Sequence, residues 1–137
     1  MAFSLRVSAN LKQLAVIRHF VREKLSEFGV GAQITADVIL AVDEAATNIV
    51  QHGYEGSDGS IEIEIYRDSD SLVIRLRDNA IQFDPTKLPT PDLNLPLERR
   101  PLGKMGVYLM NELMDEVRYH ALGGGGNELT LVKRKLF

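Results

Sequence analysis

The sequence predicts an α+β fold: a two-layer sandwich whose mostly antiparallel sheet is covered on one face by helices. Residues 61–65 and 72–76 alternate between apolar and polar side chains, which is the period of strands with one buried face. Residues 14–28 and 38–49 repeat apolar side chains every three or four positions, which is the period of amphipathic helices. Packing the helices on the apolar face of the sheet buries both sets of side chains.

A first strand, expected at the edge of the sheet, is predicted over residues 3–7, where apolar and polar side chains alternate. Asn10, with Gln13 three residues later, predicts the start of the first helix. Gly29 and Gly31 predict its end. Its apolar face consists of Leu14, Ile17, Val21, Leu25 and Phe28.

The second predicted helix carries a polar stripe. Thr35 is expected to cap this helix, which ends at Gly53. Glu44, Asn48 and His52 fall at i, i+4 and i+8 and lie along the edge of its apolar face. A carboxylate and a carboxamide one turn apart can hold a proton acceptor next to a metal-bound phosphate. Any solvated helix can carry the same spacing, so the stripe alone identifies no site.

The middle of the chain contains a hairpin and then a long irregular segment. The turn Asp68-Ser69-Asp70 joins strands 61–65 and 72–76. All five prolines lie within residues 81–102, which excludes a long helix or a central strand there. Long loops in compact domains are usually functional or disordered. We expect a mobile lid over a ligand, and a plain surface excursion is the alternative.

Three elements are predicted after this segment: a helix from Gly106 to about Met114, a strand over residues 116–120, and a last strand over residues 129–133. The four glycines at 123–126 can close the hairpin between the two strands without binding anything.

Composition narrows the class of protein. The 137 residues predict one domain spanning residues 1–137. A net charge of −3 and the lack of a basic face argue against nucleic-acid binding. Without cysteine, the chain has no disulfide, thiolate metal site or thiol nucleophile. It contains no apolar run of membrane-spanning length and no signal-peptide core, so we expect a cytoplasmic protein that does not contact the membrane.

Three segments together suggest a function. They are the stripe-bearing segment 43–54, a strand entering a turn-rich loop at 76–85, and a glycine-punctuated helix start at 101–110. In this order they resemble the nucleotide-binding boxes of the GHKL (histidine kinase-like) ATPase superfamily, which has the Bergerat fold and includes gyrase, sensor histidine kinases and MutL. The greatest similarity is to the short bacterial anti-sigma factors that are also serine-protein kinases. The resemblance covers nearly the whole chain and implies ATP and Mg²⁺ as cofactors.

The resemblance also implies residue roles. Glu44 corresponds to the general base that accepts the proton of a serine hydroxyl, Asn48 to the Mg²⁺ ligand, and Asp78 to the acceptor of the exocyclic amine of adenine. Ala80 and Lys104 stand where relatives usually have glycine. The methyl group of Ala80 either crowds the base or fills its pocket. The other implied nucleotide-binding residues are Asn48, His52, Ala80, Phe83, Gly103, Lys104, Met105, Gly106, Val107 and Thr130. For His52, packing at the helix end is an alternative.

The implied function is that of an ATP-binding anti-sigma factor and serine/threonine-protein kinase. Such a protein phosphorylates an anti-sigma factor antagonist, a small STAS-type protein, and sequesters a sigma factor. The departures at Ala80 and Lys104 leave open a nucleotide-responsive binding module with little or no kinase activity, or a vestigial pocket. A homodimer that uses the predicted edge strand is possible.

Overall fold

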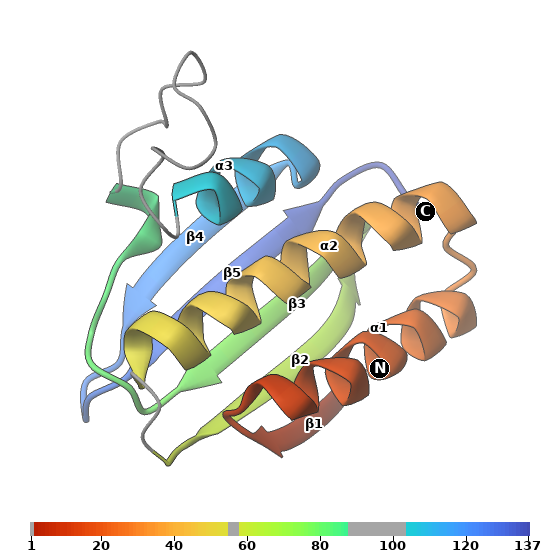
Figure 1. Cartoon of the computed structure of the whole chain (residues 1–137). Helices are drawn as coiled ribbons and strands as arrows, with labels where there is room; N and C mark the ends of the chain where they lie inside the picture. Colours follow the sequence, from red (N-terminus) through yellow and green to blue (C-terminus); the bar gives the residue numbers. More distant parts are fainter. Residues whose placement is uncertain (1, 55–57, 88–103) are drawn as a thin grey trace.

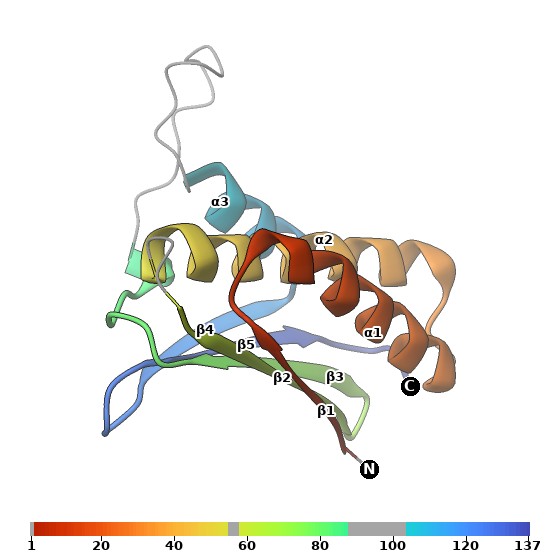
Figure 2. The same cartoon turned by 60° about the horizontal axis from the view of Figure 1, so that its bottom comes forward.

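A computed structural model describes residues 2–54, 58–87 and 104–137, with only the backbone described for His52, Lys87 and residues 104–107. These residues form two layers: a five-stranded sheet, and helices that lie on one of its faces (Figures 1 and 2). Every pair of neighbouring strands is antiparallel, which confirms the predicted fold class. Most of the expected lid over residues 81–102, namely residues 88–102, lies outside the described residues.

The strands are β1 (Ala2–Ser8), β2 (Ser60–Asp68), β3 (Ser71–Asp78), β4 (Glu116–Ala121) and β5 (Asn127–Lys133). Their order in the sheet is β1-β2-β3-β5-β4, so β1 is an edge strand as predicted. The last strand in sequence lies inside the sheet, between β3 and β4. This insertion places the start of β5 beside the end of β3, where Asp78 pairs with Asn127.

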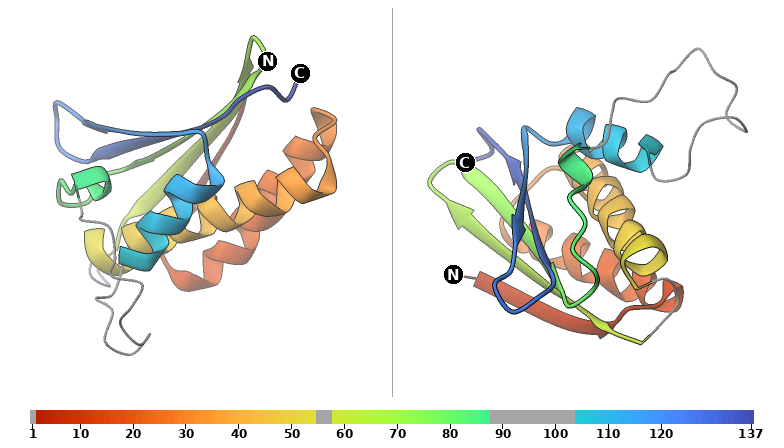
Figure 3. Two further views of the ribbon diagram at one scale, coloured as in Figure 1. Left: turned by 90° about the horizontal axis from the view of Figure 1, so that it is seen from above. Right: turned by 90° about the vertical axis from the view of Figure 1, so that its left-hand side faces the viewer.

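The helices are α1 (Leu14–Glu27), α2 (Ala32–Asn48) and α3 (Lys104–Leu113). In Figure 1, α2 crosses the middle of the sheet, with α1 and α3 on either side of it. The left view of Figure 3 shows the sheet and the helices as separate layers. α3 is already helical at Lys104, two residues before its predicted start.

The core lies between these layers because both contribute apolar faces. Ile63, Ile65, Ile74 and Leu76 have no exposed surface, and these strand residues face the helices. Their helical partners in the core include Ile17, Val21, Leu25, Val38, Ala41 and Val42. Alternate side chains in residues 61–65 and 72–76, all of them apolar, therefore face the core, and the side chains between them lie on the open face of the sheet.

Both predicted helix starts can be checked. Asn10 accepts a hydrogen bond from the Gln13 N–H at 3.2 Å, as expected, through a short 3-10 turn that leads into α1. The predicted cap at Thr35 is wrong, because α2 begins at Ala32. Gly31 is in an extended conformation, and its carbonyl already accepts the Thr35 N–H at 3.0 Å.

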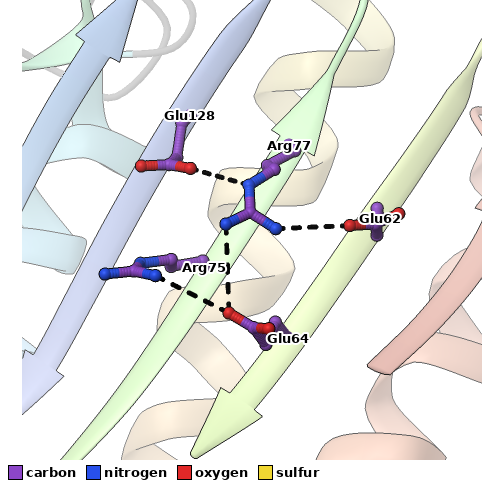
Figure 4. Close-up of polar contacts among 5 residues, drawn as sticks. All are labelled: Glu62, Glu64, Arg75, Arg77 and Glu128. Atoms are coloured by element: carbon purple, nitrogen blue, oxygen red, sulfur yellow. Dashed lines mark hydrogen bonds and ion pairs between the residues drawn. The ribbon is translucent and has the colours of Figure 1, made fainter. Parts of the chain in front are cut away.

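The open face of the sheet carries a network of charged side chains (Figure 4). Arg77 contacts Glu128 on β5 at 2.7 Å, Glu62 on β2 at 3.3 Å and Glu64 at 3.9 Å. Arg75 contacts Glu64 at 3.7 Å. These cross-strand contacts link three neighbouring strands on a face that no helix of the described chain covers.

No helix in the described part of the chain combines the length and the apolar character needed to cross a bilayer.

Neighbouring residues on β3 test this division of the sheet into a core face and an open face. Leu76→Ala is expected to lower the free energy of unfolding by roughly 2–5 kcal/mol, because it leaves a cavity in the core. Arg77→Ala should cost about 1 kcal/mol or less, since its ion pairs are partly solvated. Urea denaturation measures both. Equal costs would contradict the assignment of Arg77 to an uncovered face.

Candidate functional site

One hollow collects side chains from both layers and from the segment after β3. The space among its lining residues, open solvent included, is about 420 Å³. The end of α2, the segment that follows β3 and the β4–β5 connection lie at this side of the molecule (Figures 1 and 3). The structure thus brings the predicted residues Asn48, Asp78 and Phe83 around one space. The full lining is Ala45, Asn48, Ile49, Gly53, Asp78, Ile81, Phe83, Pro85, Met110, Tyr119, Asn127 and Leu129.

Asn48 is the last residue of α2, where the helix widens into a π-helical turn at Ile49–Gly53. Its side-chain nitrogen Nδ2 is buried and has no hydrogen-bond partner among the described residues. Buried polar groups are nearly always hydrogen-bonded, and widened helical turns of this kind are frequent at functional sites. An unpartnered amide that lines a hollow therefore points to a ligand there.

Glu44 lies one turn before Asn48 on the same side of α2. It is half-buried and has no hydrogen-bond or ion-pair partner among the described residues. Burial raises the pKa of its carboxyl group above the usual 4.5, and the neighbouring charge of Asp43 raises it further. Asp43 itself pairs with Arg18 of α1 at 2.7 Å. Glu44 does not line the hollow, but it lies one turn along α2 from Asn48, which does, and its carboxyl group has raised basicity.

Asp78 ends β3 as a buried carboxylate that is 5% exposed. Its Oδ1 accepts hydrogen bonds from the Ala80 N–H and from Nδ2 of Asn127, both at 2.9 Å. Burial raises the pKa of Asp78, and the two hydrogen bonds oppose that rise. No described residue donates to its Oδ2. Asp78 therefore offers the hollow one acceptor oxygen, held in place through the other.

Asn127, which was not among the residues predicted from the sequence, is the centre of the polar wall of the hollow. Its Oδ1 accepts the Phe83 N–H at 2.9 Å and the Tyr119 hydroxyl at 2.6 Å. Its Nδ2 donates to Asp78 and, at 3.0 Å, to the carbonyl of Ile81. A polar first residue of a strand directly after a glycine run is the only local signal, and that signal is weak.

Ala80 does not crowd the hollow. It is buried and does not belong to the lining of the hollow. Its methyl group faces Gly53 so closely that a Cβ added to Gly53 would lie 2.9 Å from the Cβ of Ala80. The methyl group at position 80 therefore fills space that the missing side chain of Gly53 leaves. This contact packs the segment after β3 against the end of α2.

Tyr54 joins the same two segments by hydrogen bonds. Its hydroxyl accepts the Asn79 N–H at 2.8 Å and contacts the carbonyl of Ser60 at the start of β2, also at 2.8 Å. The ring is 8% exposed. Tyr54 therefore fixes the distance between the end of α2 and the end of β3, the two walls that carry Asn48 and Asp78.

The other predicted residues fall in three groups. Thr130 pairs with Arg75 and faces away from the helices, because successive residues of β5 alternate and Asn127 and Leu129 face the hollow. The structure thus does not bring Thr130 to the site. Gly103 lies outside the described residues. Only the backbone is described for His52 in the π-helical turn and for Lys104, Met105, Gly106 and Val107 in the first turn of α3.

Comparisons with known proteins identify the family of the chain. Residues 7–133 match the family described as the histidine kinase-like ATPase domain. The chain is 33% identical to the serine-protein kinase RsbW of Bacillus cereus (strain B4264) over 118 residues, which cover 83% of this chain and 74% of that protein. It is 32% identical to RsbW of Bacillus mycoides over the same shares.

A solved structure shows the same fold. The crystal structure of the RsbU and RsbW domains of Rv1364c from Mycobacterium tuberculosis superposes with a TM-score of 0.70 at 23% identity. The match covers 98% of this chain and 32% of that longer one.

The contact between Gly53 and Ala80 predicts a coupled pair. Gly53→Ala should lower the free energy of unfolding by about 1–3 kcal/mol, because its methyl group overlaps that of Ala80. In the double variant with Ala80→Gly, part of this loss should be recovered. A double-mutant cycle from chemical denaturation measures the coupling. Strictly additive costs would mean that the two positions do not touch.

The raised pKa of Glu44 predicts a pH dependence of stability. Between 4.5 and the folded pKa, the folded state binds more protons than the unfolded one, so Glu44 lowers stability as the pH rises through that window. Glu44→Gln should therefore raise the melting temperature at pH 7, and the gain should shrink below pH 4.5. Glu112→Gln, which removes an exposed carboxylate from α3, is the control for the loss of one negative charge. A Glu44→Gln gain that persisted unchanged in acid would contradict the assignment.

Proposed function

The chain belongs to the histidine kinase-like ATPase family, and we propose that it transfers the terminal phosphoryl group of ATP to a serine of a small antagonist protein and sequesters a sigma factor in an alternative complex. ATP binding follows from the family, and protein-serine kinase activity follows from curated relatives with 33% identity. The observation that best supports the detailed proposal is the shared hollow, in which α2 contributes Asn48 and β3 contributes Asp78.

The lining of the hollow offers the chemistry that the base of ATP needs. Ile49, Ile81, Met110 and Leu129 supply apolar walls on which a flat purine can lie. Asp78 supplies the one polar group needed on that wall, an open carboxylate oxygen that can accept the exocyclic amine of adenine. Ala80 and Asn127 hold the Asp78 side chain in place before a ligand binds, so binding costs little side-chain entropy there.

The phosphate end of the ligand is assigned to α2 and α3. Magnesium on phosphates usually keeps several waters and takes only one or two protein ligands. The described residues hold no cluster of three or more His, Cys, Asp or Glu side chains suited to a metal. The side-chain amide of Asn48 fits this requirement, because its oxygen can serve as the single protein ligand. Its unpartnered Nδ2 is left to donate a hydrogen bond to a phosphate oxygen. When bound, the ion neutralises phosphate charge.

α3 can contribute its N-terminus. The N–H groups of a first helical turn and the helix dipole favour an anion, so we assign Lys104, Met105, Gly106 and Val107 to the phosphates. By the family resemblance, His52 and Gly103 complete the set.

Glu44 is the proposed general base. A carboxylate that accepts a proton from a serine hydroxyl must be free of competing cations and have a pKa raised toward the working pH. Among the described residues, Glu44 meets both conditions, because burial and Asp43 raise its pKa while Arg18 is engaged by Asp43. Its place one turn from Asn48 lets a hydroxyl sit between the base and the phosphate.

The edge of the sheet offers a surface for a second copy of the chain. β1 is an edge strand whose outer backbone pairs with no described strand, so it can support a homodimer by strand pairing.

A kinase assay separates the proposed roles. With labelled ATP, Mg²⁺ and a candidate antagonist, Glu44→Ala should slow serine labelling by roughly 10²–10⁴-fold, because it removes the general base, while ATP affinity stays within a few-fold. Asp37→Ala is the matched control, since it removes a carboxylate from the same helix two turns away, and it should label normally.

Three other outcomes would contradict the proposal. Normal labelling by Glu44→Ala would place the base elsewhere. Wild-type protein that binds ATP but labels no cognate partner would favour a nucleotide-responsive binding module. Calorimetry that detects no ATP binding would indicate a vestigial pocket.

A further inference from the structure

Asn127 uses every hydrogen-bonding position of its side chain. The amide has two donor hydrogens and an oxygen with two acceptor positions. Its donors are taken by Asp78 and Ile81, and its oxygen by Phe83 and Tyr119, at distances between 2.6 and 3.0 Å. Since Phe83 donates from its backbone N–H and Ile81 accepts through its carbonyl, only one orientation of the amide satisfies all four partners. The side chain is therefore locked.

This locked amide determines what Asp78 can offer a ligand. A carboxylate oxygen accepts about two hydrogen bonds. Both positions on Oδ1 are filled, one by Asn127 and one by the Ala80 N–H. Oδ2 receives no hydrogen bond from any described residue, so a ligand in the hollow meets a single acceptor oxygen rather than a two-oxygen fork.

The number of open oxygens matters because purines differ in their donors. Adenine presents one exocyclic amine on the edge that pairs with a carboxylate. Guanine presents two adjacent donors, N1–H and the 2-amine, which suit a carboxylate with both oxygens free, as in other bidentate pairs. Against a single open oxygen, one guanine donor is left buried without a partner, and such a group lowers affinity.

We propose that Asn127 is a positioning residue that sets purine specificity: by filling Oδ1 of Asp78, it leaves one acceptor, which matches adenine and disfavours guanine. The inference rests on the proposed nucleotide site. It assigns a chemical task to a residue on β5, 49 positions from the carboxylate that it controls.

If Asn127 only anchored the segment after β3, its removal would have a different effect on nucleotide binding. Asn127 also anchors the segment after β3 through Ile81 and Phe83, so its removal loosens that segment as well. Gln82 anchors the same segment, since its Nε2 donates to the Leu122 carbonyl at 3.1 Å, and it neither lines the hollow nor contacts Asp78. Gln82→Ala therefore loosens the segment without freeing Oδ1.

The test measures dissociation constants of the full chain for ATP and GTP with Mg²⁺ by calorimetry. The wild type should prefer ATP by at least about tenfold. In Asn127→Ala this ratio should fall about tenfold, because GTP gains an acceptor, while Gln82→Ala should keep the wild-type ratio. Equal weakening of both nucleotides in Asn127→Ala, or the same fall in ratio in Gln82→Ala, would overturn the inference.

A ligand-side measurement on the wild type covers the case in which Asn127→Ala does not fold. Inosine triphosphate has the N1–H of guanine but lacks the 2-amine, so with one open oxygen it should bind more tightly than GTP. GTP binding that equals or exceeds that of inosine triphosphate would overturn the inference. A wild type that binds no purine triphosphate would instead refute the proposed function.

Discussion

Burial of the apolar face of α2 on the sheet is the constraint on which the site depends. The sheet has one face of isoleucine and leucine side chains that must leave water, and α2 covers its centre. That packing fixes the direction of the helix, and its length carries the last turn to the end of β3. Asn48 and Asp78 face one hollow because of this alignment, although no direct bond joins them.

The end of β3 adds a second constraint, because a buried carboxylate must be hydrogen-bonded or neutral. Asp78 obtains its partners from Ala80 and Asn127, and these bonds turn the chain out of the sheet into the segment that carries Phe83. The insertion of β5 between β3 and β4 makes this possible, since it puts Asn127 directly beside Asp78. Sheet topology and ligand chemistry are therefore linked at one residue pair.

Packing at the boundary between the helices and the sheet accounts for Ala80, which stands where relatives usually have glycine. A methyl group at position 80 is compatible with the site because Gly53, which has no side chain, leaves room for it, and Ala80 does not line the hollow. Tyr54 strengthens the same boundary through its hydroxyl. The effect of alanine at position 80 thus depends on Gly53, which belongs to another segment. Comparing position 80 alone between relatives does not reveal this dependence.

The sequence by itself determined the kinds of elements and the polar stripe of α2. Periods of two and of three to four residues are local properties, and Glu44 and Asn48 share a helix whose geometry fixes their spacing. Only the tertiary structure decided the position of β5 in the sheet, the partnership of Asn127 with Asp78, and the turning of Thr130 toward the open face. These features follow from strand register and from contacts between residues far apart in the chain, which no local pattern encodes.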